Sequence, residues 1–122
     1  MRLLDSNIII YAASPQFDFL RKMIANENPF VSIISKIEVL GYHKLSEKEK
    51  HILLSFFNSA SIIGLSETIA NKSVSLRQKH NLTLGDAIIA ATAIENTLEL
   101  VTRNTIDFKH IAGLKIYNPF TQ

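Results

Sequence analysis

Thr83-Leu84-Gly85-Asp86-Ala87-Ile88-Ile89-Ala90-Ala91-Thr92-Ala93-Ile94-Glu95 has the pattern of a helix, because small and apolar residues recur at steps of three and four and no proline interrupts them. Its alanines carry little side-chain bulk, so this helix can lie close against a sheet. Within this stretch Asp86 is the only acid before Glu95, and it stands in the first turn of the predicted helix. Close packing would hold it at a fixed depth, where an acid is either a helix cap or a ligand.

The segments around this helix alternate between short apolar runs and amphipathic stretches. The predicted strands are Leu3-Leu4, residues 30–34, residues 61–65, residues 98–102 and residues 115–117. Helical patterns lie between them, and parallel neighbours in a sheet need such crossover helices. The sequence therefore predicts an α/β domain built around a parallel sheet.

Composition limits the classes of protein to consider. With 122 residues the chain is expected to form a single domain over residues 1–122. No apolar run approaches the roughly 18 residues of a membrane-spanning helix, so we expect a soluble, cytoplasmic protein with no membrane partner. The absence of cysteine excludes disulfides and thiolate metal sites. A net charge of +2 with a pI near 9.0 weakly favours an anionic partner.

Acidic and amide side chains follow several of the predicted strands. Asp5, Glu38 and the pair Asn104/Asp107 each come just beyond a strand, and the carboxyl ends of parallel strands are where ligands bind. Each also has a structural alternative: Asp5 or Asn7 could cap a helix, Ser35-x-x-Glu38 has the pattern of a capping box, and Asn104 is a candidate N-cap.

Carboxylates from four separated segments would repel one another if they met at one crevice. Two unit charges about 4 Å apart repel by roughly 4 kcal/mol at an effective dielectric near 20. A hard divalent cation removes this conflict, since oxygen ligands suit Mg²⁺ or Mn²⁺. Such an ion can promote phosphodiester hydrolysis. No G-x-S-x-G motif or phosphate-binding glycine loop competes with this hypothesis.

Four motifs, in this order and spacing, resemble those of PIN-domain ribonucleases, and more narrowly of the VapC toxins of toxin–antitoxin pairs. They are Met1-Arg-Leu-Leu-Asp5-Ser-Asn7, Ser35-Lys-Ile-Glu38, Leu84-Gly-Asp86-Ala-Ile-Ile-Ala-Ala-Thr-Ala93 and Val101-Thr-Arg-Asn104-Thr-Ile-Asp107-Phe108. The resemblance implies a PIN-like fold, with a central parallel sheet of four to five short strands and helices on both faces.

The resemblance also implies a site and partners. Asp5, Glu38 and Asp86 match the core acids of a Mg²⁺- or Mn²⁺-dependent endoribonuclease, and either Asn104 or Asp107 would complete the site. Among the substrate-binding candidates, Thr102 matches a hydroxyl that often lies beside such sites, Ser6 is a weaker one, and Arg103 could hold the RNA backbone. Homodimerisation and a VapB-like antitoxin are the partners implied, besides an RNA substrate.

Two alternatives stay open at this stage. The chain could be a PIN-type RNA-processing nuclease without an antitoxin, or a non-catalytic PIN-like binding module whose acids are helix caps. The nuclease hypothesis requires that Asp5, Glu38 and Asp86 face a common space. Side chains pointing to unrelated surfaces would end it.

Overall fold

A parallel sheet with the strand order β3-β2-β1-β4-β5 lies at the centre of the computed structural model, which describes residues 1–121. β1 (Arg2–Leu4) is the middle strand, between β2 (Phe30–Ser32) and β4 (Glu99–Val101). β3 (Ser61–Ile63) and β5 (Ile116–Tyr117) form the edges. Because all pairs are parallel, the carboxyl ends of the strands meet at one edge of the sheet.

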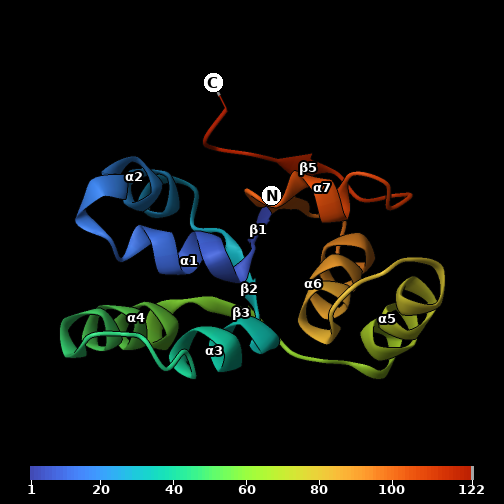
Figure 1. Ribbon diagram of the computed structural model, residues 1–122, viewed down its shortest axis with the longest axis horizontal. Coiled ribbons are helices and arrows are strands. Elements are labelled where there is room, and N and C mark those ends of the chain that lie inside the picture. The colour runs from blue at the N-terminus through green and yellow to red at the C-terminus, as the bar shows by residue number, and fades with distance from the viewer. Residues whose placement is uncertain (122) are drawn as a thin grey trace.

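Helices cover both faces of this sheet, which confirms the predicted α/β, PIN-like architecture. In Figure 1, α1, α2 and α4 lie on one side of the strands, and α5 and α6 lie on the other. Within residues 1–121, no helix combines the length and apolar character needed to cross a membrane. The helices are α1 (Ser6–Ala12), the short 3₁₀ helix Pro15–Phe17, α2 (Asp18–Glu27), α3 (Ile33–Leu40), α4 (Glu47–Ser59), α5 (Glu67–Lys79), α6 (Leu84–Glu95) and α7 (Thr105–Phe108).

Two hydrophobic cores follow from the alternation of side chains along the strands. Leu3 of β1 packs with α5, α6 and Phe108 on one face, whereas Leu4 packs with α1, α2 and α4 on the other. Successive residues of a strand point to opposite faces, so two adjacent leucines serve both layers. The sheet is therefore buried on both sides, as expected for parallel strands.

The alanine-rich helix α6 is buried along almost its whole length, from Gly85 to Ala93. Thr83 is its N-cap, and the Thr83 hydroxyl accepts a hydrogen bond from the Asp86 amide at 3.2 Å. Small side chains let both α5 and the sheet approach this helix. The prediction that α6 packs closely is confirmed, and it fixes the depth of Asp86.

Of two Ser-x-x-Glu patterns in the chain, one forms a capping box and the other does not. Ser46 and Glu49 form a reciprocal capping box at the start of α4. Ser35-x-x-Glu38 does not form one, because β2 ends early and α3 begins at Ile33 with Ser32 as its N-cap. Ser35 and Glu38 therefore lie inside the helix, where Glu38 is not needed to satisfy backbone groups.

Candidate active site

Asp5 lies at the carboxyl end of the central strand and is held from three directions. Its amide donates to the Val101 carbonyl at 2.9 Å. Its carboxylate accepts hydrogen bonds from the Ser6 amide and from the Thr102 hydroxyl, each at 2.8 Å. Burial raises the pKa of Asp5, these two hydrogen bonds lower it, and the charge of Glu38 raises it further. Asp5 is thus the N-cap of α1, as the structural alternative proposed, and it also lines a pocket.

Glu38 reaches toward Asp5 from the second turn of α3. The Ser6 hydroxyl donates to Glu38 Oε1 at 2.7 Å, and it is also 2.9 Å from the Ser35 hydroxyl, to which it is hydrogen bonded. On the other side, the Glu38 carboxylate lies where a Cβ on Gly85 would be, so only glycine leaves room for it. The sequence did not reveal this role of Gly85, and its only signal is a glycine within the first turn of a helix.

Asp86 approaches from the first turn of α6 and is half-buried. Burial, and after it the charges of Asp5 and Glu38, raise the pKa of Asp86 to about 6. The hydrogen bond with Thr83 opposes this rise, and the charge of Asp107 adds to it. The electrostatic influence of Asp5 and Glu38 on Asp86 means that the three acids belong to one local environment.

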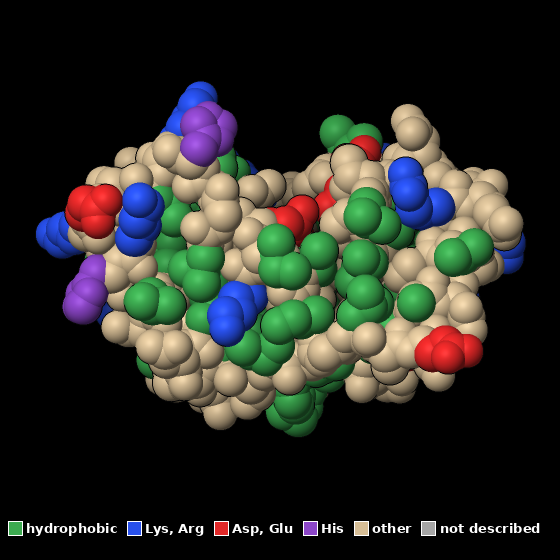
Figure 2. Space-filling view, turned by 90° about the horizontal axis from the view of Figure 1, so that it is seen from below, with side chains coloured by type: hydrophobic (Ala, Val, Ile, Leu, Met, Phe, Trp, Pro, Cys, Tyr) green, Lys and Arg blue, Asp and Glu red, His purple; other side chains and the backbone are tan. Residues whose placement is uncertain are grey.

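These three acids line a single pocket of about 370 Å³, together with Ser6, Asn7, Ile10, Tyr11 and Tyr42. The structure thus brings Asp5, Glu38 and Asp86 to a common space, as the nuclease hypothesis requires. Figure 2 shows acidic side chains at the bottom of a hollow in the surface. Asn7, Tyr11 and Tyr42 were not singled out as site residues from the sequence, although Asn7 stands two positions after Asp5.

Asn104 and Asp107 are not among the residues that line this pocket. The Asn104 side-chain amide donates to Asp107 Oδ2 at 2.8 Å, so the two residues form a pair at the start of α7. Asn104 occupies the predicted N-cap position but makes no capping hydrogen bond with its side chain. It lines a smaller neighbouring pocket with Asp5. Asp107 is exposed and lines neither pocket.

The three residues predicted to bind substrate have different environments. Thr102 is fully buried, and its hydroxyl donates to Asp5 while accepting from the Asn104 amide at 3.0 Å. A substrate contact by Thr102 does not fit this burial, so the structure gives it a positioning role. Ser6 lines the pocket and orients Glu38. Arg103 is exposed, with its guanidinium over the Phe120 ring.

The donor set fits a hard divalent cation in chemistry and charge. Every acidic side chain in the pocket offers carboxylate oxygens, the ligands that Mg²⁺ and Mn²⁺ prefer. In residues 1–121, no lysine, arginine or histidine forms an ion pair with Asp5, Glu38 or Asp86. Over the same residues, no three acidic, histidine or cysteine side chains are already drawn together as a metal site. Binding of a cation by these acids together would therefore require their side chains to move.

Comparisons with known proteins agree with this fold. Residues 2–114 match the family model of the PIN domain. A toxin–antitoxin complex from Klebsiella pneumoniae contains a chain with 34% sequence identity, a TM-score of 0.79 and 98% coverage of both chains. VapBC2 from Rickettsia felis, bound to a promoter DNA fragment, has 28% identity and a TM-score of 0.80, covering 96% of this chain and 97% of that one. FitAcB from Neisseria gonorrhoeae has 25% identity and a TM-score of 0.78 over both whole chains. The comparison with curated proteins gave no match.

Proposed function

The chain belongs to the PIN domain family, and from this premise we propose that it is the VapC-type toxin of a toxin–antitoxin pair, a Mg²⁺- or Mn²⁺-dependent endoribonuclease. The observation that carries the proposal is the common pocket of Asp5, Glu38 and Asp86, which form no ion pair with any lysine, arginine or histidine among residues 1–121. Neither helix capping nor sheet packing requires all three acids to share this pocket. A non-catalytic module would gain nothing from their mutual repulsion.

The hydrogen bonds of the pocket support a role in phosphodiester hydrolysis. The Ser6 amide and the Thr102 hydroxyl fix both oxygens of Asp5, and the Ser6 hydroxyl fixes one oxygen of Glu38. A divalent cation held by these acids would supply a Lewis acid for a phosphoryl oxygen and for water. Asp86 holds a proton below about pH 6 when no cation is present. We therefore expect cation binding and cleavage to decline below that pH.

The proposal is tested by comparing two acids on the same helix. Asp86→Asn removes one carboxylate from the pocket with little change in shape. Glu95→Gln makes the same chemical change at the exposed far end of α6. With purified proteins and a mixed-sequence RNA in Mg²⁺ or Mn²⁺, we expect the first variant to lose cleavage by a factor of at least 100 and the second to retain it, since removal of one key electrostatic group typically costs ~10²–10³ in rate. Equal cleavage by both variants would refute the assignment.

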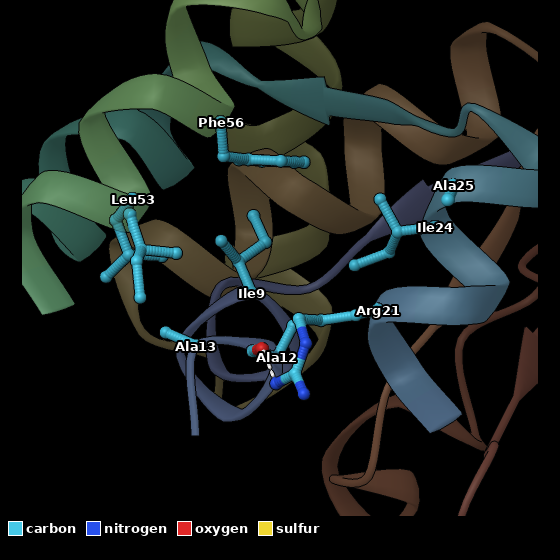
Figure 3. A pocket seen from close by; sticks show the side chains of 9 residues that line it. Ile9, Ala12, Ala13, Arg21, Ile24, Ala25, Leu53 and Phe56 are labelled. Atoms are coloured by element: carbon cyan, nitrogen blue, oxygen red, sulfur yellow. Dashed lines mark hydrogen bonds between the residues drawn. The ribbon is translucent and has the colours of Figure 1, made fainter. Parts of the chain in front are cut away.

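An apolar groove on the face of the sheet opposite α5 and α6 is a candidate surface for the antitoxin. It has a volume of about 190 Å³ and lies between α1, α2 and α4. Figure 3 shows Ile9, Ile24, Leu53 and Phe56 around it, with Arg21 at its rim hydrogen bonded to the Ala12 carbonyl at 3.0 Å. Because the relative from Klebsiella pneumoniae was solved as a toxin–antitoxin complex, we propose that an apolar segment of the antitoxin occupies this groove.

Two exposed aliphatic residues of α4 provide a test of this proposal, because one lines the groove and the other does not. Ile52 lines the groove and is 38% exposed, whereas Leu54 is 49% exposed and does not line it. We expect Ile52→Glu to abolish co-purification with the product of a short reading frame adjacent to the gene, while Leu54→Glu keeps it. Growth arrest on expression of this chain alone, relieved by that product, would support the toxin function. Harmless expression would instead favour an RNA-processing nuclease.

A homodimer belongs to the same proposal. Ile37 of α3, Val74 of α5 and Leu84 of α6 are more than half exposed, at 64%, 56% and 57%. Figure 2 shows hydrophobic side chains gathered on one face beside the acidic hollow. Burial of such side chains between two copies would place the two acidic pockets in one assembly. Light scattering on the purified protein measures the mass and would reveal a monomer if the proposal is wrong.

A further inference from the structure

A second, smaller pocket continues from the acidic pocket along α1. It has a volume of about 160 Å³ and is lined by Asp5, Asn7, Tyr11, Arg103 and Asn104. Asp5, Asn7 and Tyr11 line both pockets. We call this second space the side pocket. A polynucleotide whose phosphate lies against the acids can extend directly into it.

Arg103 is held at the side pocket by aromatic rings and not by acids. Its guanidinium lies 4.1 Å from the centre of the Phe120 ring and 5.5 Å from that of Tyr11. Over residues 1–121 its side chain makes no hydrogen bond or ion pair. Arg2 differs, because it is paired with Glu99 and Glu27 in addition to lying over Tyr117. The planar donor fork of Arg103 is thus oriented by stacking and remains available to a ligand.

The rings that hold Arg103 support one another. Phe120 packs edge-on against Tyr11, Phe17 and Phe19, with ring centres 5.6, 5.3 and 5.3 Å apart. Such pairs add ~0.5–1.5 kcal/mol each beyond their burial. The aromatic wall is therefore fixed before any ligand arrives, and a base that stacks beside it would order few side chains on binding.

The polar groups of the side pocket complement a base better than a phosphate. Asn7 is exposed and makes no side-chain hydrogen bond within residues 1–121. Asn104 donates through its amide nitrogen to Asp107, which leaves its side-chain oxygen as an acceptor. Together with the donors of Arg103, the pocket offers both acceptors and donors beside an aromatic face. Guanine presents O6 and N7 to an arginine fork, and its N1–H and N2–H groups match carboxamide oxygens.

Resting on the proposed nuclease function, we propose that the side pocket binds the base of an unpaired guanine nucleotide next to the phosphate that faces Asp5, Glu38 and Asp86. Arg103 and Asn7 are then specificity-determining residues, and Phe120 is a positioning residue for Arg103. The substrate must be single-stranded at this point, because a paired base cannot enter a pocket of this kind without leaving its stack.

The test measures binding without metal, so that it does not depend on cleavage. The probes are fluorescein-labelled hexacytidylate and the same strand with one internal guanine, followed by fluorescence anisotropy in EDTA at low salt. We expect the wild type to bind the guanine strand about tenfold more tightly, as for one good bidentate contact. Arg103→Lys should remove most of this preference, because lysine keeps the charge but lacks the fork. Asn7→Ala should weaken the preference as well.

Arg2→Lys is the matched control, since Arg2 also stacks on a tyrosine but at the opposite end of the strands. It should leave the guanine preference unchanged. Absence of a preference in the wild type, or its survival in Arg103→Lys, would overturn the inference and leave Arg103 as a phosphate contact. A separate cleavage assay in Mn²⁺ distinguishes the two proposals. Cleavage without guanine preference refutes only the side pocket, and preference without cleavage refutes only the nuclease.

Discussion

Replacement of Asp86 by asparagine should stabilise the metal-free protein while it removes metal binding. The pKa of Asp86 is raised from 3.8 to about 6 in the folded protein, first by burial and then by Asp5 and Glu38. A rise of this size corresponds to ~3 kcal/mol. Because the side chain is half-exposed, solvent screening reduces the expected value to about 1–2 kcal/mol.

The direction of the pH dependence follows from the raised pKa. Below pH 3.8 the proton is bound in both the folded and the unfolded chain, and the stabilisation is fully present. It is lost as the pH rises through about 6, where the folded protein must release the proton into a repulsive environment. Wild-type stability in EDTA should therefore fall by about 1–2 kcal/mol between pH 4 and pH 7 from this group. Asp5 has a raised pKa too and adds to the fall.

Chemical denaturation in EDTA at pH 4.5, 6.0 and 7.5 measures this effect directly. At pH 7.5 we expect Asp86→Asn to be more stable than wild type by about 1–2 kcal/mol, or roughly 4–8 °C in Tm. The difference should shrink at pH 4.5. Added Mg²⁺ or Mn²⁺ should raise the Tm of the wild type and of Glu95→Gln, but not that of Asp86→Asn. A variant that is less stable than wild type at pH 7.5, or that responds equally to metal, would refute the view of Asp86 as a strained ligand.

Three further substitutions separate positioning from stability. Gly85→Ala should retain the fold, because the added Cβ meets only the flexible end of Glu38; cleavage should fall at least tenfold, and unchanged cleavage would mean that the position of Glu38 is unimportant. Thr102→Val should lower the free energy of unfolding by about 1.5–3 kcal/mol, since it removes a hydrogen bond to a buried carboxylate; a urea titration measures the loss, and a neutral result would contradict the proposed support of Asp5. Ser46→Ala should cost about 1 kcal/mol through loss of the capping box at α4, with cleavage per folded molecule unchanged; a drop in cleavage would indicate that α4 influences the pocket.

Local patterns were sufficient to predict most of the fold. Apolar runs separated by helical periods predicted a parallel sheet, and the order β3-β2-β1-β4-β5 has every strand parallel. The capping box at Ser46 depends on local sequence alone, because its hydrogen bonds join residues three positions apart. The capping box that was the structural alternative at Ser35 does not form, for a tertiary reason: the start of α3 is set by Ser32 at the end of β2. A capping motif alone does not determine where a strand gives way to a helix.

The acids that line the candidate pocket could be picked out from the sequence, but their contacts could not. Resemblance to a family and position after a strand identified Asp5 and Glu38, and both line the predicted pocket. No short-range pattern connects Thr102 to Asp5 or Ser6 to Glu38, because these contacts join residues 97 and 32 positions apart. They are visible only once the strands have been placed side by side.

By itself, the sequence determined the kinds of element, the small-residue face of α6 and the acids available for chemistry, because these depend on the periodicity and chemical type of neighbouring residues. Only the tertiary structure decided that Glu38 fits against Gly85, that Thr102 is buried and donates to Asp5, and that Arg103 rests on Phe120. The physical reason is that each of these contacts depends on the relative placement of distant segments, which is fixed by packing of the whole core on both faces of the sheet.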